Sequence, residues 1–109
     1  MRVGRYKLVW FAPREALETT RAAVFEVGAG QIGRYARCSW YTAGTGTFLA
    51  GEGADPSIGQ VGKEQRVSEL RVETVVPAEL ARAAVDALLV AHPYEEVAYE
   101  LYPLADLEP

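Results

Sequence analysis

The sequence predicts an α+β fold in which a strand–helix–strand unit occurs twice, with a hairpin between the two units. In both halves, a run rich in β-branched and aromatic residues lies next to a pattern with helical spacing. Both helices are expected to begin at a Pro-x-Glu sequence, at Pro13 and Pro77, which lie 64 residues apart. The centre, residues 28–62, holds nine of the ten glycines. This order describes a ferredoxin-like βαββαβ arrangement: a four-stranded antiparallel sheet with two helices on one face and a long glycine-rich hairpin.

The length and composition indicate one globular domain spanning residues 1–109, because half of the residues are apolar and 24% are charged. A net charge of −4, with Arg and Glu well mixed, argues against nucleic-acid binding. The apolar runs are too short for a membrane span or a secretory signal, and the single cysteine forms no internal disulfide. We therefore expect a cytoplasmic protein that binds neither nucleic acid nor membrane.

The first unit begins with a strand over residues 6–11, which is apolar on both faces and is therefore central or covered by a second subunit. Pro13 can start the following helix, since proline fits the first helical turn. Apolar or small residues then recur at helical spacing, at Leu17, Thr20, Val24 and Val27. Gly28 is expected to end this helix, because glycine tolerates the left-handed conformation.

The glycine-rich centre opens with residues 28–33, which match the pattern G-x-G-x-x-G. A dinucleotide site needs a strand before this pattern and a helix after it. Here a helix precedes it and a strand pattern, residues 35–41, follows. We therefore interpret it as a helix end and a tight turn. Residues 42–48 and 51–56 are predicted to be loops, and loops of this length are uncommon in a compact domain unless they are functional or ordered by a partner.

The second unit repeats the order of the first. Residues 67–76 alternate as a long strand, and an apolar stripe then marks a helix that ends at His92-Pro93. Alternation over residues 97–102 predicts a final strand that ends at Pro103. With both helices on one face, the outward apolar residues Val9, Phe11 and Val75 need another cover, and self-association over the open face is the simplest one.

Titratable side chains are densest just after the second helix. The set His92, Glu95 and Glu96, joined by Cys38, is a candidate for divalent-metal binding, but three or four ligands must converge and the chain has one His and one Cys. A helix end with solvated carboxylates is the alternative. Cys38 is either a small packed hydrophobe or a ligand or redox group. Arg34 and Arg37 either receive an anion or are solvated.

Several motifs, taken together in order, resemble a known family. Residues 28–39, 44–48, 51–56, 58–59, 61–62 and 92–99 are similar to the inserted middle domain of the Nif-three-like dinuclear-metal-centre hexameric proteins. The His92-Pro93-Tyr94 turn also resembles that of the CutA divalent-ion-tolerance family. Both resemble the trimer-forming PII signalling proteins in fold. The two-metal site of the full-length family lies in flanking domains whose motifs are absent here, so the chain resembles a stand-alone version of the insert, and the hydrolase-like chemistry does not carry over.

The resemblance implies a homotrimeric PII-like binding or regulatory module, without enzymatic activity, whose ligand lies in a cleft between subunits. The effector would be a small molecule or an anion, and no cofactor is assigned. The expected ligand-binding residues come from the glycine-rich centre and the turn after the second helix: Arg34, Tyr35, Arg37, Cys38, Gly44, Thr45, Gly46, Thr47, Glu52, His92, Tyr94, Glu95 and Glu96. Three alternatives stay open: a CutA-like divalent-metal protein, a purely structural oligomerisation domain, and an enzyme using a Cys38–His92 pair.

Overall fold

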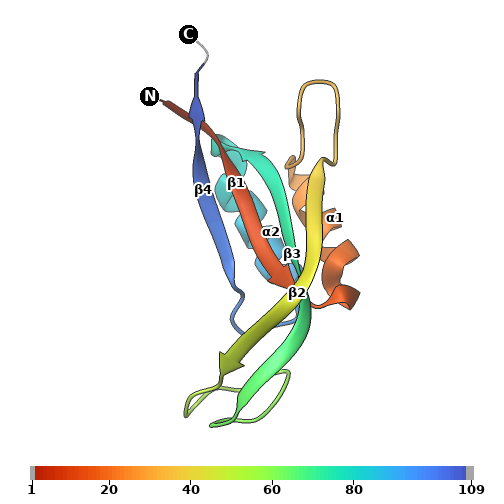
Figure 1. Ribbon diagram of the computed structural model, residues 1–109. Coiled ribbons are helices and arrows are strands. Elements are labelled where there is room, and N and C mark those ends of the chain that lie inside the picture. Colours follow the sequence, from red (N-terminus) through yellow and green to blue (C-terminus); the bar gives the residue numbers. More distant parts are fainter. Residues whose placement is uncertain (1, 108–109) are drawn as a thin grey trace.

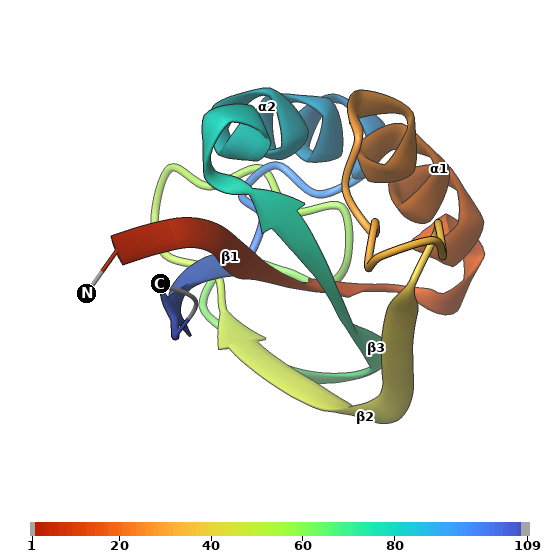
Figure 2. The ribbon, with the colours of Figure 1, turned by 90° about the horizontal axis from the view of Figure 1, so that it is seen from above.

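The fold is a four-stranded antiparallel sheet with both helices on one face, as the sequence predicts. The computed structural model describes residues 2–107. Its elements are β1 (Arg2–Ala12), α1 (Leu17–Val27), β2 (Ser39–Leu49), β3 (Glu64–Pro77), α2 (Ala81–Ala91) and β4 (Tyr99–Asp106). The strands lie in the order β2-β3-β1-β4. Figure 1 shows the sheet with the long β2–β3 hairpin, and Figure 2 shows the helices together on one side of it. No helix in this part of the chain is long and apolar enough to cross a membrane.

Both helices begin where the sequence places them. A short 3-10 turn, Arg14–Ala16, follows Pro13, and another, Ala78–Leu80, follows Pro77. Proline has no N–H to leave unpaired at this position, and its fixed φ suits a first turn. The first helix ends at Gly28, whose φ of +125° is a conformation that other residues avoid.

The core lies between the sheet and the helices. On β1, alternate residues face the helices, and the same period repeats on β3. The largest fully buried side chains are Trp10, Leu8, Leu88, Val9, Val24, Val72, Val76 and Thr20. The buried indole of Trp10 donates from Nε1 to Oγ1 of Thr20 at 3.0 Å, and that hydroxyl donates to the Ala16 carbonyl at 2.7 Å. The threonine in the helical stripe is therefore a polar partner within an apolar core.

The open face of the sheet is partly covered by its own charged side chains. Lys7 pairs with Glu73 at 3.7 Å, and Arg71 pairs with the same carboxylate at 3.0 Å. The Arg71 guanidinium also lies 5.7 Å from the centre of the Phe11 ring. Val9, between these groups, is fully buried without a second subunit. The expectation that Val9 needs an external cover is therefore too strong, because long charged side chains bury their stems over apolar surface.

The predicted loop over residues 42–48 is wrong: it is part of β2. The strand pairs with β3 without interruption from Ser39, opposite Thr74, to Leu49, opposite Glu64. The ladder uses backbone groups, so glycines do not prevent it, and the threonines between them favour a strand. Gly46 has a specific role, because an added Cβ would collide with the carboxylate of Glu69. The glycine marks a close approach rather than a turn.

Two strand ends also differ from prediction. The strand expected from residue 35 begins at Ser39, because Ile32 and Tyr35 exchange backbone hydrogen bonds of 2.9 Å and close an exposed turn. At the other end of the chain, β4 continues through Pro103 to Asp106. A proline is tolerated there because β4 is an edge strand.

The molecule is elongated, measuring 51 × 27 × 22 Å. The described ends meet at one end of it, where Arg2 of β1 pairs with Asp106 of β4. At the opposite end, the tip of the β2–β3 hairpin and the loop over residues 50–63 project beyond the helices (Figure 1). The candidate site lies at this second end.

Candidate functional site

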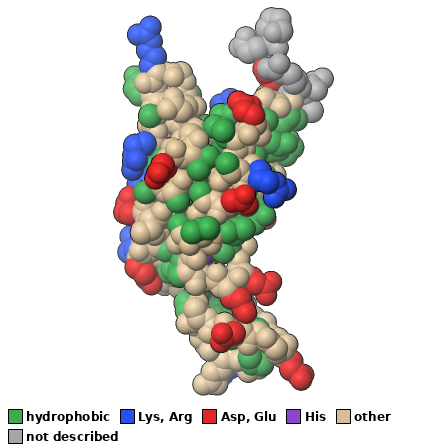
Figure 3. All heavy atoms as spheres, turned by 180° about the vertical axis from the view of Figure 1, so that it is seen from behind, with side chains coloured by type: hydrophobic (Ala, Val, Ile, Leu, Met, Phe, Trp, Pro, Cys, Tyr) green, Lys and Arg blue, Asp and Glu red, His purple; other side chains and the backbone are tan. Residues whose placement is uncertain are grey.

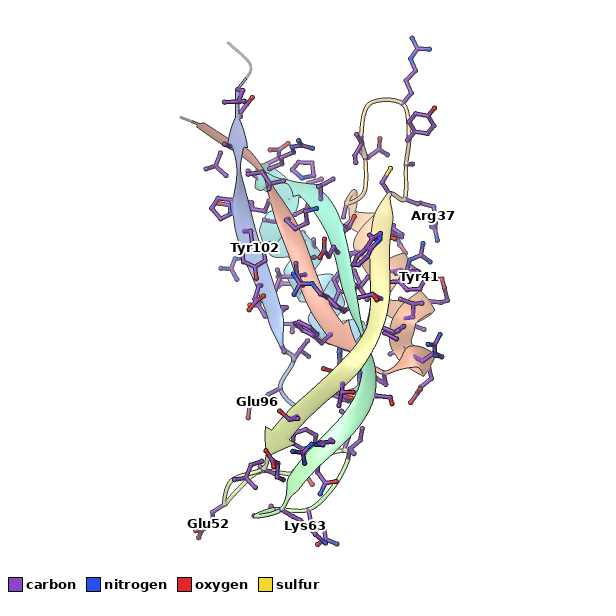
Figure 4. All side chains as sticks on the ribbon, in the orientation of Figure 1. Arg37, Tyr41, Glu52, Lys63, Glu96 and Tyr102 are labelled. Carbon is purple, nitrogen blue, oxygen red and sulfur yellow. The ribbon has the colours of Figure 1, made fainter. Side chains whose placement is uncertain are left out.

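A cavity of about 330 Å³ lies between the β2–β3 hairpin with its connecting loop and the turn after α2. The apolar part of its wall includes Phe11, Phe48, Leu49, Ile58 and Val67. The polar side chains of the lining are Thr47, Ser57, Glu69, Tyr94, Glu95 and Glu96. Figure 4 labels Glu96 and Glu52 at this end of the molecule. Segments far apart in the sequence thus form one concave surface.

The turn after α2 is held in place by the buried side chain of His92. Its Nδ1 accepts the N–H of Tyr94 at 3.1 Å, so the proton resides on Nε2, which donates to the Phe11 carbonyl at 2.7 Å. The two rings also meet edge to face, with centroids 4.8 Å apart. Burial lowers the pKa of His92, against the opposing effect of the Phe11 carbonyl. His92 is a neutral positioning group, and both of its nitrogens are already engaged.

A second contact joins the turn to the loop after β2. The backbone N–H of Asp55 donates to Oε1 of Glu95 at 3.1 Å. Both residues are exposed, so this bond competes with water and is weak. It nevertheless links two segments that line the cavity, through Ala54 and Pro56 on one side and Glu95 on the other.

Glu69 is the most unusual group of the cavity wall. Its carboxylate lies over the bare backbone of Gly46. Within residues 2–107 it has neither a hydrogen-bond donor nor a cation as a partner. Partial burial raises the pKa of Glu69, as expected for a half-buried carboxylate that no neighbouring cation compensates.

Tyr94 lies beside this carboxylate. Its hydroxyl is buried and has no hydrogen-bond partner in the described chain. Burial raises the pKa of Tyr94, and the charges of Glu69 and Glu15 raise it further. A buried, unsatisfied hydroxyl is uncommon in proteins and marks a site where a further group can be accommodated.

The structure brings some of the sequence-predicted residues together. Gly46, Thr47, Tyr94, Glu95 and Glu96 line the cavity. Gly44 and Thr45 line a neighbouring hollow of about 230 Å³, which shares Phe11 and Glu69 with the cavity. His92 lies behind the turn, and Glu52 lies in the connecting loop.

The other predicted residues lie elsewhere. Arg34, Tyr35, Arg37 and Cys38 belong to the segment between α1 and β2, and Figure 4 shows Arg37 near the end opposite to Glu96. Cys38 is held there by its backbone, which donates to the Gly30 carbonyl at 2.9 Å and accepts from Oγ1 of Thr74 at 2.6 Å. Across residues 2–107, no three His, Cys, Asp or Glu side chains converge on a metal position.

Glu69 and Phe11 line the cavity but are not among the site residues predicted from the sequence. Both are ordinary members of a strand pattern, and only the register of the sheet and the bend of the hairpin bring them to the cavity. One signal was available: Gly44 and Gly46 are two residues apart in a segment with strand-forming threonines. A glycine inside a strand can mark a close approach of another group, and here this approach occurs at Gly46.

The cavity is acidic. Glu69, Glu95 and Glu96 are in its lining, and no Lys or Arg among the described residues is. In the view from behind, Asp and Glu side chains are prominent over the lower part of the molecule (Figure 3). Such a cavity favours a cation or a hydrogen-bond donor over an anion.

The fold and its bent hairpin define the class: a CutA-like ferredoxin fold. The periplasmic divalent cation tolerance protein CutA from Archaeoglobus fulgidus has a TM-score of 0.69 and 15% identity, over 94% of this chain and 85% of that one. CutA1 from the psychrotrophic bacterium Shewanella sp. SIB1 has a TM-score of 0.72 at 11% identity, over 97% of this chain and 86% of that one. At this identity the likeness concerns the fold alone.

Sequence similarity points to a smaller group of relatives than the fold does. The chain is 54% identical over 98 residues to the GTP cyclohydrolase 1 type 2 homolog of Mycobacterium tuberculosis, and 45% identical over 98 residues to that of Bacillus subtilis. A Bacillus cereus protein related to NIF3 superposes with a TM-score of 0.83 at 44% identity, over 94% of this chain and 26% of that one.

The matched segment covers 90% of this chain and 26% of each of the two curated relatives. The chain thus spans about a quarter of their length. It is a close homologue of one segment of the NIF3-related proteins, which confirms the resemblance seen in the sequence. No family model matches the chain.

Proposed function

We propose that this chain is a PII-like binding module that holds a small ligand in the cavity between the long hairpin and the turn after α2. The observation that carries the proposal is the cavity itself, whose volume of about 330 Å³ falls in the range of small-molecule sites. Its walls combine apolar side chains with a few polar groups, which is the usual composition of such sites.

The regulatory output in this proposal is the position of the connecting loop. The loop over residues 50–63 contains no strand of its own and touches the turn through the weak Asp55–Glu95 bond. A ligand that contacts both walls stabilises the closed arrangement and thereby shifts the loop population. The ordered loop then presents a different surface to another protein.

We propose that the module is not an enzyme. His92 is neutral and bonded through both nitrogens, so it has no free lone pair to act as a base. Cys38 lies apart from the histidine. Its neighbour Ser39 pairs with Thr74 of β3, whereas Phe11, the partner of His92, pairs with Arg71, three residues or about 10 Å away along that strand. The activity in the relatives' name belongs to chains of which this segment is about a quarter.

We further propose a cytoplasmic homotrimer that assembles over the open face of the sheet. Trp40 and Tyr102 lie on this face and are 59% and 44% exposed. Large exposed aromatic side chains on an uncovered sheet are typical of an interface. Purely structural assembly, without a ligand, is the rival interpretation.

A divalent metal is the second candidate ligand, favoured by the carboxylates of the turn and by the names of the CutA neighbours. Of the proposed set His92, Glu95, Glu96 and Cys38, the histidine has both nitrogens engaged and the cysteine lies in the segment before β2, so Glu95 and Glu96 would need further ligands from another subunit, because residues 2–107 bring no three such groups together. Zinc and copper titration of the protein and of Glu96→Gln, which removes one carboxylate of the turn without touching His92, tests this candidate.

The experiment that tests the proposed function is a thermal-shift and NMR screen of the oligomer against nucleotides, inorganic phosphate, organic ammonium compounds and divalent metals. We expect one class to raise the melting temperature and to shift the amide signals of residues 46–58 and 94–98. A folded protein that responds to none of them would leave structural assembly as the function.

A further inference from the structure

We propose that the cavity selects a small organic ammonium compound, whose cationic head pairs with the carboxylate of Glu69 while its apolar body lies against Phe11 and Phe48. This inference rests on the proposed function and names the chemical class of its ligand. It follows from three features of the cavity: the position of the Glu69 carboxylate, the negative charges of the neighbouring glutamates, and the apolar side chains of the remaining wall.

The position of Glu69 is built into the strand pair. Glu69 lies opposite Gly44 on β2, and its carboxylate extends over Gly46, where any side chain would displace it. The carboxylate thus lies against the backbone of Gly46 and borders both the cavity and the neighbouring hollow. A side chain at Gly46 would displace this carboxylate, whereas an added Cβ at Gly44 meets no atom within 4 Å.

The charge of Glu69 has no counter-ion in the described chain. The nearest cation along β3, Arg71, is engaged by Glu73 at 3.0 Å and lies over Phe11. Arg66, three residues away on the other side, pairs with Glu64 at 3.7 Å. A partly desolvated carboxylate without a partner is unfavourable, and a ligand cation would remove this cost.

The surrounding groups exclude an anion and do not form a metal site. Glu95 and Glu96 line the same cavity, so a phosphate or carboxylate would meet three negative side chains. A divalent metal needs several converging ligands, which the described residues lack. A single ammonium needs one carboxylate, and its carbon body matches Phe11, Phe48 and Val67.

Binding should depend on pH in a definite direction. Burial raises the pKa of Glu69, and only the ionised carboxylate attracts a cation, so affinity increases as the pH rises through that pKa. The other titratable or charged groups around the site are Tyr94, Glu95, Glu96 and, at the neighbouring hollow, Arg71; Glu15 acts on Tyr94. The Tyr94 phenol stays neutral here because its pKa is raised.

The test uses benzylammonium, benzyl alcohol and benzoate, which differ in charge at nearly constant size, with n-butylammonium as a second cation. We expect calorimetry and NMR to show binding of the two cations, weaker binding of the alcohol and none of benzoate. Glu69→Gln should lower cation affinity about tenfold or more, because it removes the charge and keeps the shape. Glu64→Gln on the same strand is the matched control and should change nothing.

A second pair of variants tests the position of the Glu69 carboxylate without removing its charge. Gly46→Ala should weaken cation binding by displacing the Glu69 carboxylate, whereas Gly44→Ala, whose added Cβ meets no atom within 4 Å, should not. Circular dichroism of each variant confirms folding. Equal loss in both alanine variants would overturn the role assigned to the Gly46–Glu69 contact.

The outcomes separate the ligand class from the proposed function. If benzoate, inorganic phosphate or a nucleotide shifts the cavity signals and the cations do not, the binding module stands and the ammonium class is overturned. If no compound of any charge shifts them, both are overturned. If Glu69→Gln changes the oligomeric mass in analytical ultracentrifugation, the counter-ion belongs to another subunit, and the ammonium proposal is wrong.

Discussion

The imidazole of His92 joins the turn after α2 to the end of β1 through a 2.7 Å hydrogen bond from Nε2 to the carbonyl of Phe11. The two residues are 81 positions apart in the chain. Phe11 lines the cavity on one side and the turn carries Tyr94, Glu95 and Glu96 on the other. The histidine thus sets the distance between two walls of the site without entering it.

Replacing this histidine should cost stability in a graded way. His92→Ala leaves the Phe11 carbonyl without its partner and should lower the free energy of unfolding by about 1–3 kcal/mol. His92→Gln should cost less, since its amide can donate to the same carbonyl. Urea denaturation measures both, and equal midpoints for the alanine variant and the unchanged protein would contradict the assignment.

The same residue predicts a pH dependence. Burial lowers the pKa of His92 in the folded state below its unfolded value of about 6.5. Its contribution to stability is therefore fully present above about pH 6.5 and is lost as the pH falls from there toward the folded pKa. Urea midpoints between pH 7.5 and 5 should fall more steeply for the unchanged protein than for His92→Gln. Parallel profiles would exclude His92 as the titrating group.

The Trp10–Thr20 hydrogen bond should contribute measurably to the core. Thr20→Val removes the acceptor of the buried indole N–H and should destabilise the fold by about 1–3 kcal/mol, although shape is retained. Thr20→Ser keeps the hydroxyl and should recover part of this loss. The matched control is Thr19→Val, one position along the same helix but exposed, which should change the unfolding free energy little.

Two glycines with left-handed backbones should respond differently to alanine. A Cβ at Gly30, with φ +87°, would lie 2.9 Å from Cε1 of Phe25 and 3.0 Å from the backbone nitrogen of Cys38. At Gly33, with φ +59°, it would meet nothing within 4 Å. Both variants bear the conformational cost of about 1–2 kcal/mol. Gly30→Ala should lose about 1–3 kcal/mol more through overlap. Calorimetric melting ranks the two, and a reversed order would refute the packing argument.

The open face should govern oligomeric state. Trp40→Glu places a charge on the exposed part of that face and should reduce the proposed trimer to monomers in analytical ultracentrifugation. Val90→Glu, on the outer side of α2 and 89% exposed, is the matched control and should leave the mass unchanged. If Trp40→Glu leaves the oligomer intact and Val90→Glu dissociates it, the subunit interface lies on the helices instead.

Sequence periodicity predicted the four strands, both helices and their arrangement. In each half the strands and the helix bury one face, and the apolar residues on that face recur with the spacing typical of a strand or a helix. The prediction was wrong at residues 42–48, where the glycines were interpreted as turn signals. These residues form part of β2, and Gly46 leaves space for the side chain of Glu69. The turn residues Tyr94, Glu95 and Glu96 were predicted as site residues and line the cavity. The role of His92 as a positioning group could not be predicted, because it depends on the Phe11 carbonyl at the far end of another strand.

The pairing of Arg2 with Asp106 has a consequence for modular design. A chain segment that begins and ends on neighbouring strands can be spliced into a loop of a host protein at a single point, without stretching either core. The cavity lies at the remote end of the 51 Å axis, so it would project away from that junction.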